Sequence, residues 1–128
     1  MQIDQRYMVM VLIPVASNSI PRVFAIHRQT AQLYKQLGAV DVEISLLADG
    51  SAKYGCLGLN CAVPLMAGEQ LMMVVDSFTD KESYSRVSKT ADKDSAISNL
   101  FEELSALVDI SRIVRAEFET PEVQDNYR

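Results

Sequence analysis

The feature that most constrains this chain is a pair of apolar runs that do not alternate with polar residues. Residues 7–15 read YMVMVLIPV, and residues 71–75 read LMMVV. In a strand with one wet face, apolar and polar residues alternate, because successive side chains point to opposite faces of the sheet. These two runs therefore predict strands, over residues 6–15 and 70–78, that are buried on both faces.

The other two predicted strands alternate, as half-exposed strands do. Residues 40–48 place apolar residues at even positions up to Leu46, with Asp41 and Glu43 between them. Residues 111–120 place an apolar set opposite a charged stripe, which we interpret as a solvated edge or as a source of ion pairs between subunits. Residues 53–68 hold glycines and Pro64 and predict a long loop, with a short strand near residues 56–61.

The helices are predicted from an apolar stripe and from end signals. Residues 20–37 carry apolar side chains at helical spacing, with Ser17–Ser19 as sources of an N-cap oxygen and Gly38 as the C-cap. Thr79 and Glu82 form a capping-box pattern that opens a polar helical segment ending near residue 90. Residues 92–95 break it and cap a second helix, which has a clear apolar stripe.

The predicted order is β-α-β-β-α-β, which defines the α+β, ferredoxin-like fold class with a four-stranded antiparallel sheet. In that topology the strands lie in the order 4-1-3-2, so the non-alternating runs are the central strands. One domain is expected over residues 1–128, with its core at about residues 6–120 and a polar tail at 121–128. Both helices of this fold lie on one face of the sheet, which leaves apolar side chains of the first strand uncovered on the other. The simplest cover is a second copy of the sheet, so we expect a homodimer.

Three stretches carry a resemblance to a known superfamily. They are the opening strand from Tyr7 to its end at residues 13–15, the helix end at residues 33–39 (LYKQLGA), and residues 74–82 (VVDSFTDKE). The chain resembles the dimeric α/β-barrel superfamily of antibiotic-biosynthesis monooxygenase-like proteins, and most closely an uncharacterised bacterial family within it. The resemblance implies two ferredoxin-like subunits packed sheet to sheet, each with a pocket between sheet and helices. The Asn-His-Trp set of the haem-degrading members does not map onto this chain, which has no Trp.

Composition excludes several classes of function. The chain of 128 residues has a net charge of -5 with scattered basic residues, which argues against nucleic-acid binding. Its longest apolar stretch is shorter than the ~20 residues that span a bilayer, so we expect no membrane partner and a cytoplasmic location. Cys56 and Cys61 are expected to be free structural thiols. With one His and two Cys, no metal site is expected, and no cofactor is expected either.

Four residues are candidates for a functional site. His27 and Tyr34 share one side of the first helix, where they can act as acid or base and as a positioning group, or can simply pack. Phe24 shares that side and is a candidate pocket residue. Asp76 ends the second apolar run, so it is a further pocket candidate or the place where the strand reaches water.

Three functional hypotheses follow. The first is a homodimer that binds a small apolar or aromatic molecule. The second, from another class, is a cofactor-independent oxygenase or isomerase, with His27 as base and Tyr34 positioning the substrate. The third is a structural or regulatory dimer without a pocket.

Overall fold

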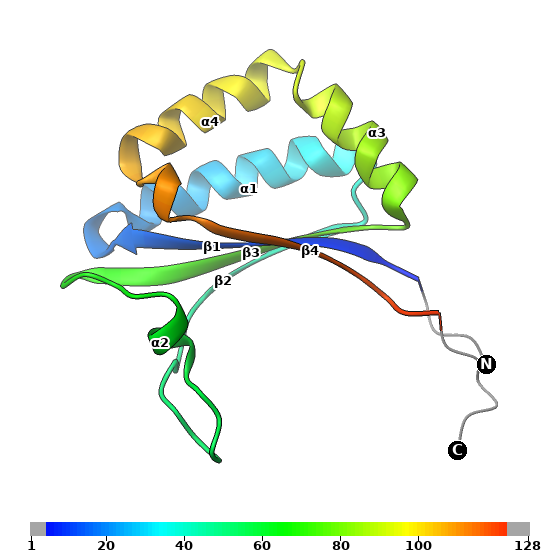
Figure 1. Cartoon of the computed structure of the whole chain (residues 1–128). Coiled ribbons are helices and arrows are strands. Elements are labelled where there is room, and N and C mark those ends of the chain that lie inside the picture. Colours follow the sequence, from blue (N-terminus) through cyan, green and yellow to red (C-terminus); the bar gives the residue numbers. More distant parts are fainter. Residues whose placement is uncertain (1–4, 123–128) are drawn as a thin grey trace.

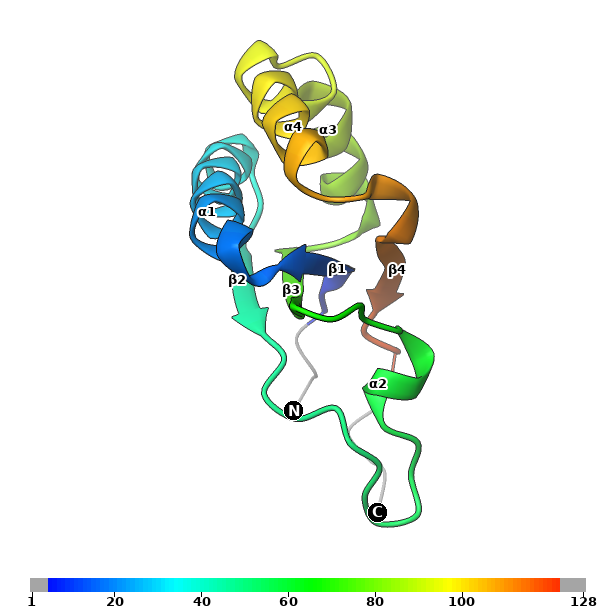
Figure 2. The same ribbon diagram turned by 90° about the vertical axis from the view of Figure 1, so that its left-hand side faces the viewer.

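A computed structural model describes residues 5–122, which form an open four-stranded antiparallel sheet with helices on one face (Figure 1). The strands are β1 (Tyr7–Ala16), β2 (Asp41–Leu46), β3 (Glu69–Phe78) and β4 (Val114–Glu119). Helices α1 (Ile20–Leu37), α3 (Lys81–Ala91) and α4 (Ser95–Leu107) cover one face, and the short α2 (Leu59–Ala62) lies beyond the other (Figures 1 and 2). Short 3-10 turns, η1 (Ser17–Ser19) and η2 (Ile110–Arg112), precede α1 and β4.

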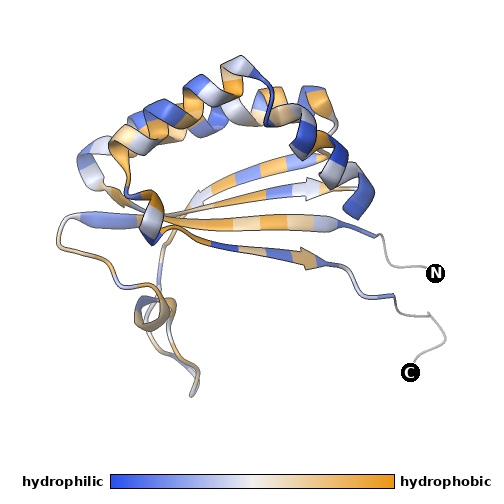
Figure 3. Ribbon diagram, turned by 45° about the horizontal axis from the view of Figure 1, so that its top comes forward, coloured by the Kyte–Doolittle hydropathy of each residue, from blue (hydrophilic) through white to orange (hydrophobic). Residues whose placement is uncertain are grey.

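The strand order is β2-β3-β1-β4, which confirms the predicted ferredoxin-like topology and the central position of both apolar strands. In the register, Val11 of β1 lies opposite Val74 of β3 on one side and Arg115 of β4 on the other. Apolar residues run along the central strands, whereas β4 alternates (Figure 3). Most of the expected tail, residues 123–128, lies outside the described residues, as do residues 1–4.

The helix ends depend on specific backbone partners. Gly38, with φ of 130°, ends α1 and donates its N–H to the carbonyl of Tyr34 at 3.1 Å. Asp94 caps α4 by accepting the N–H of Ile97 at 3.0 Å, within the predicted break at residues 92–95.

The expected cap of α3 at Thr79 is wrong by one residue, because the Asp80 carboxylate accepts the N–H of Ser83. The expected serine caps of α1 are also wrong: Ser17–Ser19 form η1, and no side chain caps α1.

The main core lies between the sheet and the helices. Odd-numbered residues of β1 and even-numbered residues of β3 point to this side and pack against α1 and α4. Phe78 is fully buried at the far end of β3, beside Val87 of α3 and Ala39. No helix within residues 5–122 is long and apolar enough to cross a bilayer.

The opposite side of the sheet, here called the outer face, is partly covered by the chain itself. Residues 47–68, here called the arm, leave β2 and fold under one end of the sheet (Figures 1 and 2). There Val63 packs with Leu12 and Leu71, which are buried. The strand expected near residues 56–61 is wrong, because this stretch forms an isolated bridge between Lys53 and Cys56 followed by α2.

The two cysteines lie in the arm. Cys56 and Cys61 are free, as expected, but exposed rather than buried.

The rest of the outer face is apolar on β1, β3 and β4 apart from Ser77, whereas β2 presents Asp41, Glu43 and Ser45 to it. The apolar side chains are those of Met8, Met10, Met73, Val75, Val114, Ala116 and Phe118, with Phe118 51% exposed. As predicted, β4 is an edge strand whose charged residues are exposed, but the face on which they lie could not be read from the sequence. The charged residues Arg115 and Glu117 of β4 face the helices, and its apolar residues face away from them.

Candidate functional site

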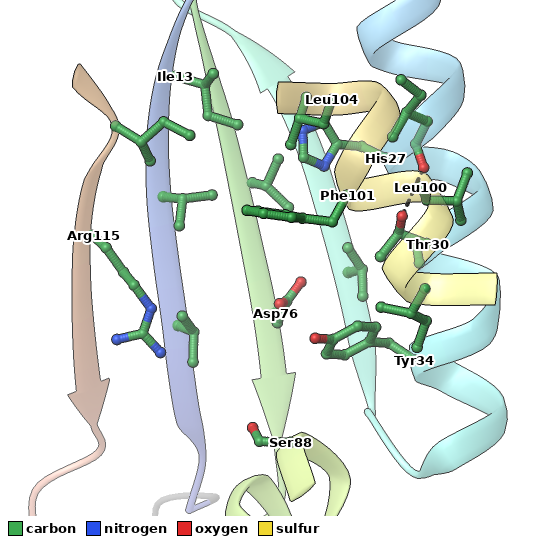
Figure 4. A pocket seen from close by; sticks show the side chains of 18 of the residues that line it. Ile13, His27, Thr30, Tyr34, Asp76, Ser88, Leu100, Phe101, Leu104 and Arg115 are labelled. Atoms are coloured by element: carbon green, nitrogen blue, oxygen red, sulfur yellow. Dashed lines mark hydrogen bonds between the residues drawn. The ribbon is translucent and has the colours of Figure 1, made fainter. Parts of the chain in front are cut away.

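A cavity of about 560 Å³ lies between the sheet and the three long helices. Val9 and Val11 of β1 and Ala31 of α1 present short side chains to it, which leaves the space open. Leu100 and Phe101 of α4 line it from the helical side (Figure 4). A mostly apolar wall with a few polar groups is typical of sites for small molecules, and the volume lies in their usual range of about 300–1,000 Å³.

Helix α1 contributes a line of polar side chains to this cavity. His27, Thr30 and Tyr34 lie about one turn apart, so they share the face that looks onto the sheet (Figure 4). The hydroxyl of Thr30 is already used, because it donates to the carbonyl of Ile26 at 2.9 Å. The Nε2 atom of His27 is buried and has no hydrogen-bond partner in the described part of the chain. Burial lowers the pKa of His27, so its imidazole is neutral at pH 7 and can accept a proton.

Strand β3 places Asp76 inside the same cavity. The strand continues beyond it to the buried Phe78, so Asp76 does not mark the point where the strand reaches water. Burial raises the pKa of the Asp76 carboxyl to about 6, and the Arg115 guanidinium offsets part of that rise. Within residues 5–122 the carboxyl makes no hydrogen bond to another side chain. Figure 4 shows the Tyr34 hydroxyl directed toward Asp76, and burial together with this carboxylate raises the pKa of Tyr34.

Arg115 borders the cavity, but its charge is already matched. Its guanidinium pairs with the Glu117 carboxylate at 2.8 Å and donates to the Tyr84 hydroxyl at 2.7 Å. The hydroxyls of Tyr7 and Tyr84 also donate to Glu117, and their rings stack at 5.2 Å. The hydrogen bond to Glu117 is the main reason that the pKa of Tyr7 rises to about 12. This network was not predicted from the sequence. The alternating residues of β4 include an apolar set, and a pattern of this kind is consistent with the charged set facing the helices.

Three of the four candidate residues meet in the cavity. His27, Tyr34 and Asp76 all line it, whereas Phe24 does not. Three residues turn a helix by about 300°, so Phe24 is offset from His27 toward solvent. It is 39% exposed and lies under the guanidinium of Arg28, 5.8 Å from the ring centre.

The cavity holds side chains that can transfer a proton. Within the described residues, no cluster of three or more His, Cys, Asp or Glu side chains is placed to hold a metal ion. A neutral imidazole, a carboxyl group and a phenol stand in a largely apolar space. They can orient a small molecule and can take or return a proton.

Comparison with solved structures identifies the fold. A dimeric ferredoxin-like protein from an uncultured marine organism superimposes with a TM-score of 0.62 at 13% identity, covering 94% of this chain and 91% of that one. A variant of SnoaB, a cofactor-independent oxygenase from Streptomyces nogalater, gives 0.56 at 12% identity, covering 96% and 99%. A hydroxynitrile lyase from Passiflora edulis gives 0.59 at 10% identity, covering 95% and 99%.

These likenesses confirm the expected fold. The chain has the ferredoxin-like α+β fold seen in dimeric ferredoxin-like proteins and in monooxygenase-like proteins such as SnoaB. The sequence matches no protein-family model and no curated protein. Since proteins with this one fold carry unrelated activities, function must be argued from the site.

Proposed function

We propose that this protein is a homodimer in which each subunit binds a small apolar or aromatic molecule between the sheet and the helices. The observation that carries the proposal is the cavity, in which His27 and Asp76 have no partner among the described side chains. Buried polar groups are normally hydrogen-bonded. A bound molecule would supply the missing partners, while its apolar body contacts the walls. A dimer without a pocket, the third hypothesis, does not fit this cavity.

Ligand binding is tested by thermal unfolding with a panel of aromatic acids, aromatic amines, quinones and flavins. A probe present at about 100 times its Kd stabilises the folded state by about 2.7 kcal/mol, which raises Tm by several degrees. Ala31→Leu, which fills the cavity, should abolish the shift. Ala106→Leu, on the exposed side of α4, should keep it. If the wild-type protein responds to none of the panel, the proposal loses its support.

The homodimer is supported by the outer face. Half of β4 consists of apolar residues that point away from the chain's own helices, although β4 is an edge strand. Burying a Val or Met side chain contributes roughly 1.5–3 kcal/mol, so three of them rival the stability of a typical domain, about 5–15 kcal/mol. The arm covers only the end of the face near Leu12 and Leu71. A second sheet covers the remainder, and solved neighbours are described as dimeric.

The dimer is tested by sedimentation at micromolar concentration. We expect a species of twice the 14.2 kDa chain mass. Val75→Asp, on the outer face, should produce monomers, whereas Ser98→Asp, on exposed α4, should leave the dimer intact. Val11→Asp should instead destabilise the subunit, because Val11 faces the cavity. A stable wild-type monomer would refute the sheet-to-sheet dimer.

An enzymatic role is the second candidate, favoured by the state of His27. A neutral, buried imidazole without a partner is suited to take a proton from a bound molecule. In this hypothesis the protein is a cofactor-independent oxygenase or isomerase, with His27 as base and Tyr34 positioning the substrate. His27→Ala should then abolish turnover of a ligand found above while the unfolding transition stays cooperative. Unchanged turnover would exclude His27 as the base.

A further inference from the structure

The charges that face the cavity do not balance. Asp76 of β3 and the exposed Asp92, which follows the end of α3, both line it. Arg115 of β4 offsets part of the charge of Asp76, but its guanidinium is already paired with the Glu117 carboxylate. On α1, His27 is neutral at pH 7, and burial holds Tyr34 in its protonated, neutral form. The unmatched charge around the cavity is therefore negative.

The Asp76 carboxylate is half-buried and has no side-chain partner within residues 5–122, and a cation is the group that stabilises it best. Hydrogen bonds between charged groups are roughly twice as strong as those between neutral groups. The Tyr34 hydroxyl lies beside Asp76 and can accept a further N–H (Figure 4). The exposed ring of Phe101 borders the same space and offers an aromatic face, which attracts cations. An anionic ligand, by contrast, would meet two carboxylates.

We propose that the molecule bound in this cavity is an amine, in which an apolar or aromatic body carries a protonated nitrogen that pairs with Asp76. The apolar body lies against Val9, Val11 and Phe101, and the nitrogen lies between Asp76 and the Tyr34 hydroxyl. This inference rests on the proposed ligand-binding function and adds the chemical class of the ligand. It also assigns Asp76, rather than His27, as the residue that selects the ligand.

The test compares three probes that share an indole ring and differ in charge: tryptamine, the neutral 3-ethylindole, and indole-3-acetate. The protein contains no Trp, so indole emission reports only the probe. We expect tryptamine to bind roughly ten- to a hundredfold more tightly than 3-ethylindole, the range typical of one charged hydrogen bond. Indole-3-acetate should bind most weakly. Tryptamine binding should weaken below about pH 6, where Asp76 takes up a proton.

Variants separate the charge effect from damage to the fold. Asp76→Asn should reduce tryptamine affinity to that of 3-ethylindole while leaving 3-ethylindole unchanged. Asp41→Asn, on exposed β2 outside the cavity, should change neither. Equal binding of all three probes, or tightest binding of the acid, overturns the amine assignment and leaves the ligand-binding function standing. If no indole probe binds, the amine assignment fails; the ligand-binding function fails with it only if the wider panel of aromatic acids, aromatic amines, quinones and flavins also leaves Tm unchanged.

Discussion

Asp76 should make the protein less stable as the pH rises, and Asp76→Asn should remove that effect. The pKa of the Asp76 carboxyl is about 6 in the folded protein, against an ordinary value of 3.8. Between these values the folded state holds a proton that the unfolded state has released. Stability therefore falls as pH rises through this window, and the full penalty is present above about pH 7.

The size of the penalty follows from the shift. One pKa unit corresponds to about 1.4 kcal/mol, so a rise from 3.8 to about 6 amounts to roughly 3 kcal/mol. Asparagine has nearly the same shape and does not ionise. We therefore compare the free energy of unfolding of Asp76→Asn with that of wild type at each pH. This difference should shift in favour of the variant by about 3 kcal/mol between about pH 4 and pH 8, whichever of the two is more stable at pH 4.

Urea unfolding at a series of pH values measures this difference directly. Comparing variant with wild type cancels the contribution of His27, whose lowered pKa acts in the opposite direction, reducing stability as pH falls below its ordinary value of 6.5. Ser77→Ala, the neighbouring residue on the outer face, is the control and should run parallel to wild type. A difference between Asp76→Asn and wild type that does not change with pH would refute the reasoning.

Three further changes test the fold around the site. Gly58→Ala should cost about 1–3 kcal/mol in urea unfolding, because an added Cβ would lie 2.1 Å from the Gly50 carbonyl oxygen; an unchanged midpoint would contradict that packing. Asp94→Ala should cost about 1 kcal/mol by leaving the Ile97 N–H uncapped, and thermal unfolding with Ser98→Ala as control measures it. Arg112→Lys should speed proteolysis of the arm, because lysine cannot make both the paired bonds to Glu69 and the bond to the Pro64 carbonyl; unchanged cleavage would mean that Arg112 does not hold the arm.

The fold was predictable because its strongest signals are local. A strand buried on both faces must lack alternation, and that identified β1 and β3 as central before any pairing was known. Helical spacing likewise placed His27 and Tyr34 on one side of α1. Gly38 and Asp94 are helix-end residues whose chemistry can be read from the sequence, so the C-terminal end of α1 and the N-terminal end of α4 were located correctly.

The other features of the site depend on strand register and on packing between elements, which the sequence of a single strand does not show. Alternation in β4 divides its residues into two sets, but only the register with β1 decides which set faces the helices. The sequence therefore predicts the exposed edge that Arg115 and Glu117 occupy, but not that both lie on the helix side of the sheet. Asp76 was ambiguous because its burial depends on Phe78, two residues further on, packing beneath α3. The arm has no periodic pattern, so its bridge and α2 could not be foreseen.

The central position of β1 also has a consequence for how the molecule folds. Its neighbours in the sheet come late in the sequence, and Arg6 donates to Thr120, a residue 114 positions away. During synthesis β1, the most apolar strand, therefore remains unpaired until β3 and then β4 have emerged. Chains dominated by such distant pairings fold slowly, over about milliseconds to seconds. The emerging chain is thus exposed to aggregation and to chaperones during that interval, and its last strand completes the sheet.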